Sequence, residues 1–466
     1  MKFMKKSVYP SLVFCILSIS AFAQGQQIGA LRPLDDNHAL ATDSGDWKMH
    51  RIIKEIPLQK RNPVILLSFG GEIREQVKYS DHLNFGDVPS GYSDQDFYLQ
   101  QRYMLHANLQ ATRFLRLFIQ LNSCHATGKD IMLPQTDRDD LGVMQAFADL
   151  YLNNSATLRL RLGRQEFLYG LDRILGLRDG PTVRQTFDGA KLTLATKKVT
   201  GDLFMVIPVS YEPGVFDNSR RSHEYVLGSY WTLPLKKNNT LDLYYFGVQF
   251  PNANYANVIA TDNRHSIGLR LGRSAGSFTY DAEFTYQFGQ FGQQDIRAWH
   301  LSSQVYFRWQ EYRWRPRLGI RESLYSGDRK QSDGIMNTFR PVSTKSPVHE
   351  MSSVGSANLA LISPEAEISL SGKLAFTLRY LAFWRLSGND GIYPPDVRRM
   401  LRETDEPGKE LGKAISQGPA LELMYTPNKH VVVWIYYGYL IAGEYIHNTG
   451  AGNNMQAFSF RAAYKF

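Results

Sequence analysis

Two arms of one stretch decide the fold: Leu158-Arg-Leu-Arg-Leu-Gly-Arg-Gln-Glu-Phe167 and, after a polar connection, Phe187-Asp-Gly-Ala-Lys-Leu-Thr-Leu194. In the first arm leucine alternates with arginine, and in the second alanine and leucine alternate with lysine and threonine. Successive side chains of a β-strand point to opposite faces, so this period predicts two strands that each have one apolar and one polar face. We interpret the apolar face as facing lipid and the charged face as lining a pore.

The same alternation continues from Pro63 to the carboxy terminus. We count about eighteen such segments, which agrees with the even strand number of closed bacterial barrels. One expected segment, 312–325, contains Pro316, which lacks the N–H that a ladder hydrogen bond needs. We therefore expect a bulge near the rim at that residue.

The connections between these segments alternate in length. Every second one is tight, such as Ser155-Ala156 or Lys197-Lys198, and the others are mostly long, such as 326–354. Tight turns at one rim and long loops at the other are typical of outer-membrane barrels, whose short turns are periplasmic and whose long loops are extracellular. The prediction is an all-β fold, a transmembrane antiparallel up-and-down β-barrel.

The bulk composition agrees with a barrel. The 466 residues are 43% hydrophobic, and the mean hydropathy is −0.32. This excludes a helical-bundle membrane protein, which needs runs of about 20 apolar residues. After residues 1–23 only Cys124 remains as a cysteine, so no intramolecular disulfide can form.

The amino terminus has the pattern of a secretory signal. Three lysines precede an apolar run at 8–19, and Ala21-Phe-Ala23 supplies small residues for cleavage. The run is too short for a membrane anchor. We therefore expect a signal peptide at 1–23, a polar periplasmic arm at 24–62 and the barrel at 63–466.

The net charge narrows the class of partner. The formal charge is +9, and it becomes +6 without Lys2, Lys5 and Lys6 of the signal. A basic protein can bind nucleic acid, but export argues against that partner. An anionic polysaccharide, lipopolysaccharide or small anions fit better.

The faces opposite the apolar residues carry roughly twice as many basic as acidic side chains. Fixed positive charge in a narrow lumen favours anions, and a guanidinium can bond both oxygens of a carboxylate. Alternatively, these charges only keep the lumen wet and hold the barrel together through cross-strand ion pairs. The candidates for an anion-binding pore on these faces are Arg74, Arg102, Arg159, Arg161, Arg321 and Arg385.

The connection between the two opening arms adds further candidates. Strict alternation would point Arg164 toward lipid, where a charge is costly. A bulge at Gly163 would turn Arg164 inward, so we expect one there. Arg178 and Arg184 would then lie near the mouth of the pore, and Asp188 would pair with one of these arginines.

Several short motifs occur in order from about residue 50 to the carboxy terminus, and as a set they resemble the alginate-export family of outer-membrane barrels. The motifs are Leu67-Ser-Phe-Gly-Gly-Glu-Ile-Arg74, Tyr98-Leu-Gln-Gln-Arg102, Leu162-Gly-Arg-Gln165, Arg178-Asp-Gly-Pro-Thr-Val-Arg-Gln-Thr-Phe-Asp-Gly189, Ser326-Gly-Asp328, Thr338-Phe339, Phe383-Trp-Arg385, Asp390-Gly-Ile-Tyr393 and Ala442-Gly-Glu444. The resemblance implies a monomeric barrel whose lumen is narrowed by arginines and a few carboxylates, and which passes a polyuronate. It adds Glu444 to the candidate pore residues. One departure is the short turn at 427–430, where the family's exporter carries a long periplasmic segment.

Enzyme chemistry finds little support in the sequence. The HExxH, CxxC and P-loop motifs are absent. We expect no enzyme, no cofactor and no metal site. Thr136-Asp-Arg-Asp-Asp140 has the oxygen ligands that calcium prefers, but we favour a solvated acidic loop.

Two functional hypotheses follow. The first is a multi-pass channel of the bacterial outer membrane that passes an acidic exopolysaccharide, such as alginate or another polyuronate, through an arginine-lined constriction. The alternative is a surface-exposed barrel whose long loops, 326–354 and 388–415, bind a partner or glycan while the lumen conducts little. In both cases we expect a monomer that contacts outer-membrane lipid and lipopolysaccharide. The barrel-insertion machinery would recognise the alternating last strand, which ends on Phe466.

Overall fold

The computed structural model describes residues 53–54, 56–58, 65–129, 136–255, 258–330, 333–343, 351, 354–397, 400–402, 404–405 and 409–466. The expected signal peptide at 1–23 and most of the expected arm at 24–62 lie outside these residues. Among the residues described, no helix has both the length and the apolar character needed to cross a membrane.

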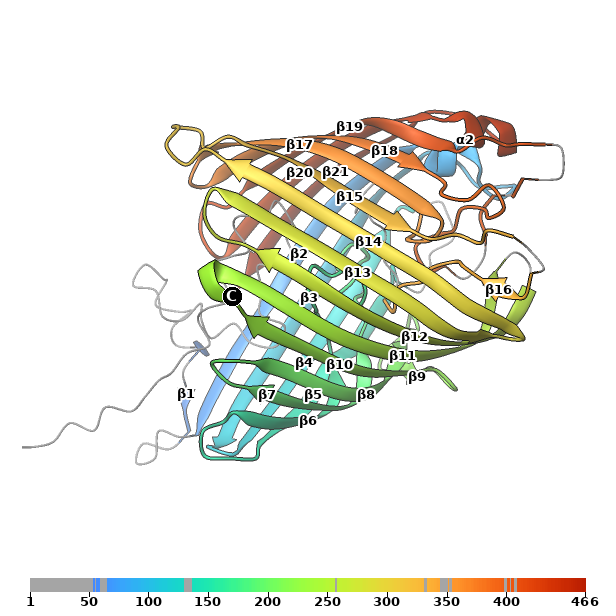
Figure 1. Cartoon of the computed structure of the whole chain (residues 1–466). Coiled ribbons are helices and arrows are strands. Elements are labelled where there is room, and N and C mark those ends of the chain that lie inside the picture. Colours follow the sequence, from blue (N-terminus) through green and yellow to red (C-terminus); the bar gives the residue numbers. More distant parts are fainter. Residues whose placement is uncertain are drawn as a thin grey trace, which may run out of the picture.

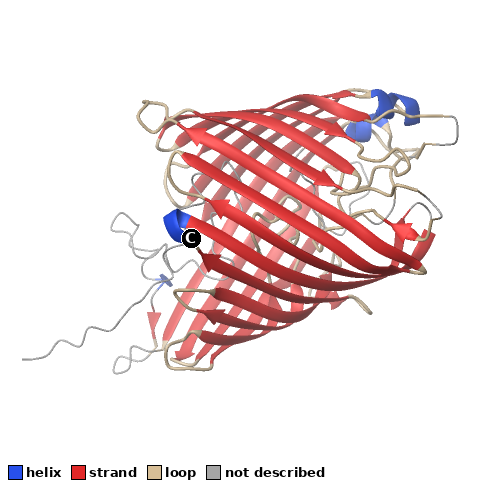
Figure 2. Ribbon diagram, in the orientation of Figure 1, coloured by secondary structure: helices blue, strands red, loops and turns tan. Residues whose placement is uncertain are grey.

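Within this part of the chain, 18 strands form one closed antiparallel β-barrel, as the sequence predicts (Figures 1 and 2). The first and last of them, β2 and β21, pair over ten residues from Glu72↔Lys465 to Asp81↔Gln456 and close the ring. In order around the ring, the strands are β2 (Leu66–Asp81), β3 (Asp96–Thr112), β4 (Leu115–Thr127), β5 (Asp139–Tyr151), β6 (Leu158–Gln165), β7 (Phe187–Ala195), β8 (Thr200–Ser210), β10 (Tyr225–Pro234), β11 (Asn239–Tyr255), β12 (Val258–Arg273), β13 (Phe278–Phe291), β14 (Gln294–Arg308), β15 (Arg317–Tyr325), β17 (Leu359–Ser371), β18 (Leu374–Trp384), β19 (Ala414–Tyr425), β20 (Val431–Ala442) and β21 (Met455–Lys465).

Shorter elements lie at the edges of this ring. The two-residue strands β1 (Ile56–Pro57), β9 (Ser219–Arg220) and β16 (Ile335–Met336) pair with β2, β8 and β14. The helix α2 (Glu444–Thr449) lies between β20 and β21, at the end of the barrel that carries the long loops (Figure 1).

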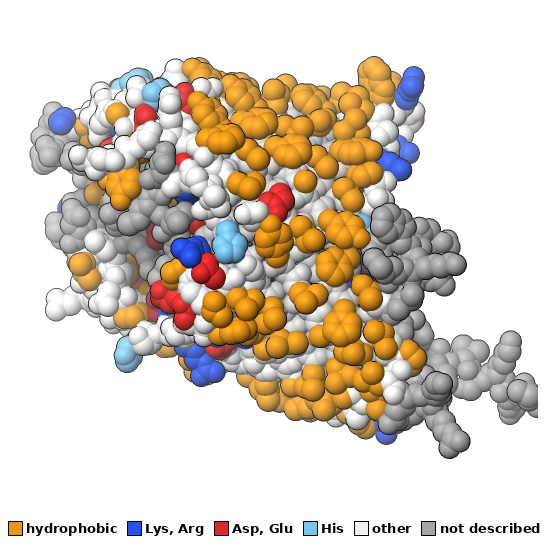
Figure 3. All heavy atoms as spheres, turned by 180° about the vertical axis from the view of Figure 1, so that it is seen from behind, with side chains coloured by type: hydrophobic (Ala, Val, Ile, Leu, Met, Phe, Trp, Pro, Cys, Tyr) orange, Lys and Arg blue, Asp and Glu red, His pale blue; other side chains and the backbone are white. Residues whose placement is uncertain are grey.

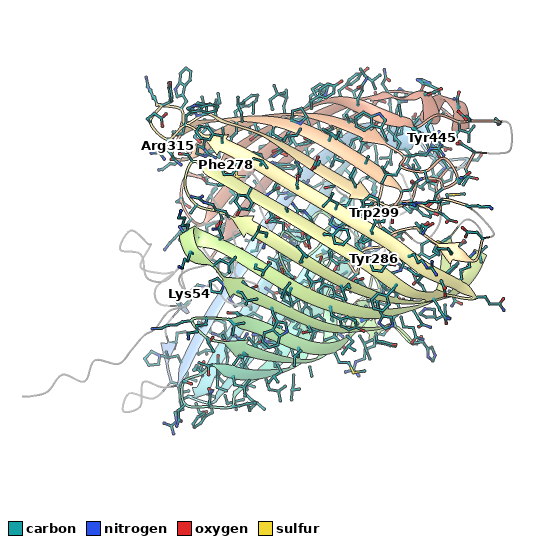
Figure 4. The ribbon with its side chains drawn as sticks, viewed as in Figure 1. Lys54, Phe278, Tyr286, Trp299, Arg315 and Tyr445 are labelled. Atoms are coloured by element: carbon teal, nitrogen blue, oxygen red, sulfur yellow. The ribbon has the colours of Figure 1, made fainter. Side chains whose placement is uncertain are left out.

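The two faces of each strand differ as the alternation predicts. On β2, Ile73 is 43% exposed on the outer surface, whereas its neighbours Glu72 and Arg74 are buried inside the barrel. Phe278 and Tyr286 of β13 likewise lie on the outer surface (Figure 4). Apolar side chains consequently cover much of the outer wall (Figure 3). Such a wall suits a hydrocarbon environment, and the polar groups lie in the interior.

The two ends of the barrel also differ as expected. Short turns join the strands at the left end of Figure 1, and most connections at the right end are long. The connection 309–316 is an exception at the short-turn end, and the expected bulge at Pro316 is wrong. β15 instead begins at Arg317, after the proline, because proline has no N–H for the ladder. Trp309 N still donates to Pro316 O at 2.9 Å, which closes this turn.

The connection between β6 and β7 determines what the barrel interior contains. We call residues 166–186 the crossing loop, since they contact opposite walls of the barrel. Arg173 reaches Asp281 on β13, and Asp179 reaches the arginines of β2 and β3, on the far side of the ring of strands. Ser343, from the β15–β17 connection, packs against this loop and donates from its N to Ile174 O at 2.9 Å. Two long connections therefore meet inside the barrel.

Candidate functional site

The clearest anion-binding arrangement lies where the crossing loop meets β2 and β3. The carboxylate of Asp179 accepts hydrogen bonds from Arg102 Nη2 at 2.7 Å, Arg184 Nε at 2.8 Å and Arg74 Nη1 at 3.4 Å. Arg74 also donates to the carbonyl oxygens of Asp179 and Pro181, at 3.0 and 3.4 Å. We call Arg74, Arg102, Arg184 and Asp179 the central cluster. Three of its members, Arg74, Arg102 and Arg184, are residues that the sequence predicted.

Two further carboxylates fix the arginines of the central cluster. Glu72, next to Arg102 across the β2–β3 ladder, accepts from Arg102 Nη2 at 2.6 Å and Nε at 3.1 Å. Glu166, at the start of the crossing loop, accepts from Arg184 Nη1 at 3.0 Å. Gln145 Nε2 donates to Glu166 at 3.3 Å, so β5 in turn positions Glu166. The guanidiniums are thus oriented from the barrel wall.

The charge state of Asp179 follows from these contacts. Burial opposes ionisation of its carboxyl group, but the charges of Arg102, Arg184 and Arg74 outweigh burial and hold the pKa of Asp179 well below its usual range. For Arg184, burial alone would lower the pKa, but the carboxylates of Glu166 and Asp179 raise it. Asp179 is therefore an anion held among cations at neutral pH.

A second group of arginines, which includes the predicted Arg159 and Arg161, lies on the barrel wall nearer the short turns. Asp149 on β5 is fully buried and accepts from Arg161 Nε at 2.7 Å and Arg116 Nη1 at 3.0 Å. Arg159 Nη1 lies 3.6 Å from the same carboxylate. The Arg161 guanidinium also stacks over the Phe147 ring at 3.6 Å. One carboxylate thus holds three cations from β4 and β6.

A third group lies on β15, β17 and β18. Arg321 Nη2 donates to Glu365 Oε1 at 2.7 Å, and Arg379 Nε lies 3.1 Å from the same oxygen. Arg379 also pairs with Glu422 on β19. The predicted interior residue Arg321 is therefore part of a ladder of alternating charges across neighbouring strands.

Arg164 contradicts the expected bulge. The ladder runs without a register shift through Phe147↔Gly163↔Gly189, so Arg164 stays on the outer face of the strand. It is directly opposite Asp188 and donates to it from Nε at 2.7 Å. Arg220 donates to the other oxygen of Asp188 at 3.2 Å. Pairing, rather than an inward turn, compensates the charge, and this ion pair does not join the central cluster.

The predicted residues Arg178 and Arg385 bind backbone carbonyl groups of the long loops. Arg178 has a left-handed backbone (φ 51°) and donates from Nη2 to Val183 O at 3.5 Å, within the crossing loop. Arg385 binds the 386–413 connection through Gly388 O and Asp390 O, at 3.1 and 3.2 Å. It also stacks over the Tyr445 ring at 3.9 Å, at the long-loop end (Figure 4).

Glu444 begins helix α2 at the same long-loop end, and it is exposed. It is not brought to the interior arginines.

Sequence reasoning missed Asp179 and Arg173. Asp179 lies inside the quoted motif Arg178–Gly189, which was the one available signal. A residue in a long loop has no alternation that gives its direction, so the pattern could not point it at β2 and β3. Arg173 was missed for the same reason, although its Nη1 lies 2.7 Å from Asp281 Oδ1.

The structure offers no arrangement for a metal in the part of the chain that it describes. There, no group of at least 3 His, Cys, Asp or Glu side chains is arranged to hold an ion. Around the acidic stretch ending at Asp140, Asp137 pairs with Lys129 and Asp140 with Arg138, while Asp139 accepts from Asn122 and Asn218.

Comparison with known proteins gives one family. The family model described as "Alginate export" matches residues 65–460. No curated protein matches the sequence.

Several solved porins have a similar fold. OccK2 (OpdF) of Pseudomonas aeruginosa superposes with a TM-score of 0.57 at 13% identity, over 86% of this chain and 97% of that chain. A BenF-like porin from Pseudomonas fluorescens Pf-5 gives a TM-score of 0.57 at 11% identity, over 86% and 98% of the two chains. OccK2 solved in complex with glucuronate gives 0.55 at 13% identity, over 86% and 98%. At such low identity the likeness concerns the fold alone.

Proposed function

This chain belongs to the alginate-export family, and we propose that it passes an acidic exopolysaccharide, such as alginate or another polyuronate, through an arginine-lined constriction. The chain is an outer-membrane channel with a porin-like fold. We propose in addition the chemical class of the solute and the residues that select it.

One observation carries the proposal: three arginines converge on a single carboxylate inside the barrel. Arg74, Arg102 and Arg184 each direct one N–H donor at the carboxylate of Asp179, and this geometry suits any carboxylate of similar size. Guanidinium groups bond carboxylates with charge-assisted hydrogen bonds, which are stronger than neutral ones. Inside a barrel, where water is restricted, such a group lowers the energy of an anion more than it would at an exposed surface.

The group around Asp149 supports passage as well as binding. Arg116, Arg159 and Arg161 share this one carboxylate, so these arginines are only partly neutralised, whereas Arg321 and Arg379 are balanced by Glu365 and Glu422. Conduction requires binding that is favourable enough for entry and weak enough for release. Carboxylates that compete with the solute for the same arginines provide this balance.

A test of the proposal is the current through single channels of the refolded protein in a planar bilayer. Glucuronate and an oligouronate would be added on one side, because each carries the carboxylate that the central cluster accepts. We expect both to interrupt the current, and the oligouronate to act at the lower concentration because it offers several carboxylates at once. Glucose and a neutral oligosaccharide serve as controls of the same size. Equal block by charged and neutral sugars would overturn the anionic-solute proposal.

The alternative function remains a surface barrel whose loops bind a partner or glycan. It is favoured by the crossing loop and by the β15–β17 connection, which meet inside the barrel. Absence of current from a folded barrel would support this alternative. We further propose that the barrel is a monomer that contacts lipopolysaccharide and is inserted through recognition of its last strand, β21.

A further inference from the structure

Asp179 differs from the other carboxylates around the central arginines in its access to solvent. Its side chain is 12% exposed, whereas those of Glu72 and Glu166 are 2% and 0% exposed. Glu72 lies on a barrel strand, and Glu166, at the start of the crossing loop, is held to the wall by Gln145 of β5. Asp179 lies in the middle of the crossing loop and is the member of the group that a solute can approach.

Two of the three arginines, Arg102 and Arg184, would keep their orientation without Asp179. Arg102 remains bonded to Glu72 through two nitrogens, at 2.6 and 3.1 Å. Arg184 remains bonded to both oxygens of Glu166, at 3.0 and 3.2 Å. A binding site whose groups are already held in place loses less entropy when it takes a ligand. Departure of the Asp179 side chain would thus leave a preorganised site for another carboxylate.

The same arginines have donor capacity that Asp179 does not use. Arg74 Nε, Arg102 Nη1 and Arg184 Nη2 are buried and have no hydrogen-bond partner among the described residues. Buried N–H groups are nearly always paired in folded proteins, because an unpaired one costs free energy. A sugar acid presents ring and hydroxyl oxygens beside its carboxylate, so it can satisfy more of these donors than one aspartate does.

We propose that Asp179 is an internal ligand: its carboxylate occupies the subsite that Arg74, Arg102 and Arg184 form for a uronate, and a uronate displaces it together with residues 178–183 of the crossing loop. This inference rests on the proposed function and names its subsite. Exchange of one carboxylate for another preserves the ion pairs. A neutral sugar would leave three buried cations without that partner, so it cannot displace Asp179. The crossing loop thereby selects for charge.

A native cysteine reports the position of the crossing loop. Cys124 on β4 is buried, and its Sγ donates to Thr182 O of the loop at 3.4 Å. Val183, the next loop residue, packs in the same small apolar cluster as Cys124. Displacement of residues 178–183 would remove this cover. The rate at which a small water-soluble methanethiosulfonate modifies Cys124 therefore measures how far the loop has moved.

The test compares this rate with and without glucuronate in the refolded wild-type barrel, after subtraction of the signal from Cys124→Ser. We expect glucuronate to raise the rate about tenfold, which is within the usual range of coupling between two sites, and glucose to leave it unchanged. In Asp179→Asn the rate should already be high without a ligand, because the amide cannot neutralise the arginines. Asp188→Asn is the matched control, since Asp188 also binds two arginines but lies outside the central cluster.

The outcomes separate the two proposals. Glucuronate could block the wild-type current but leave the rate of Cys124 modification unchanged, and Asp179→Asn could bind glucuronate no more tightly than wild type does. In that case the internal-ligand inference is wrong, and the channel proposal is not affected. If glucuronate blocks neither the wild-type protein nor Asp179→Asn, the proposed function itself fails. Should Asp179→Asn not refold, the wild-type labelling comparison alone decides the inference.

Discussion

Arg173 joins the crossing loop to the wall opposite the central cluster: its Nη1 lies 2.7 Å from Asp281 Oδ1 and 3.2 Å from Glu283 Oε2. Asp281 has a second cation, Arg270, whose Nη2 is 2.5 Å away. The loop is therefore held at both ends by ion pairs, one on β13 and one on β2 and β3. Its position across the interior depends on both.

Removal of the first anchor should open the barrel. Arg173→Ala leaves Asp281 paired with Arg270, but it removes the ion pair with Glu283 and the contact that holds the loop to this wall. We expect a larger single-channel conductance than in wild type, and more frequent switching between current levels. Arg173→Lys can keep one of the two ion pairs, so its conductance should lie between those of wild type and Arg173→Ala. A conductance identical in all three proteins would show that the loop does not limit the current.

Stability should depend strongly on Asp149. This fully buried carboxylate faces Arg116, Arg159 and Arg161, and its removal leaves three guanidiniums without their shared partner. Asp149→Asn should therefore lower the free energy of unfolding by about 3–5 kcal/mol, measured by urea titration in detergent.

The control for Asp149→Asn is Arg220→Ala, which removes an ion pair whose arginine is 65% exposed. It should cost less than about 1 kcal/mol. Equal effects of the two substitutions would contradict the assignment of Asp149 as an organising residue of the interior.

The long loops should respond to pH through Asp328. Burial, and then the nearby charge of Asp390, raise the pKa of Asp328 to about 6. Burial likewise raises the pKa of Asp390, whose Oδ2 accepts from Asp328 N at 2.8 Å. A carboxyl group with a raised pKa in the folded state favours folding while it is protonated. Its contribution is complete below its ordinary pKa near 4 and is lost as the pH rises through about 6.

We therefore expect the amides around 326–328 and 387–391 to exchange hydrogen faster at pH 7 than at pH 4, after correction for intrinsic exchange rates. Asp328→Asn should remove this difference, because an amide does not titrate. A pH dependence that persists in Asp328→Asn would assign it to another group.

Much of the barrel could be predicted because its rule is local. A strand between lipid and a polar interior must alternate, and residues such as Ile73 and Arg74 carry that alternation directly. Alternation cannot distinguish the inner from the outer face of a strand where both faces are apolar. On β20, Trp434 and Tyr436 lie inside the barrel and Tyr437 lies outside, and nothing in the spacing of these aromatic residues distinguishes the two faces.

The candidate site was predictable only in part. Arg74 and Arg102 follow from strand alternation, and they lie opposite each other across the β2–β3 ladder. Asp179 depends on the path of a 166–186 loop across the barrel, which no periodicity specifies. Arg164 was placed on the wrong face because the expectation considered only the cost of a charge in lipid. Asp188 on the neighbouring strand compensates this charge, because its Oδ1 accepts from Arg164 Nε at 2.7 Å.

The interior arginines should make the pore selective for anions, and the reversal potential of single channels under a salt gradient measures this selectivity. Wild type should reverse at the potential of an anion-selective pore. Arg74→Ala combined with Arg102→Ala should move the reversal potential toward zero, because both cations lie inside the barrel. Arg164→Ala should leave it unchanged, because that arginine is on the outer face. A wild-type channel that prefers cations, or a double variant that keeps the full anion selectivity, would contradict the account.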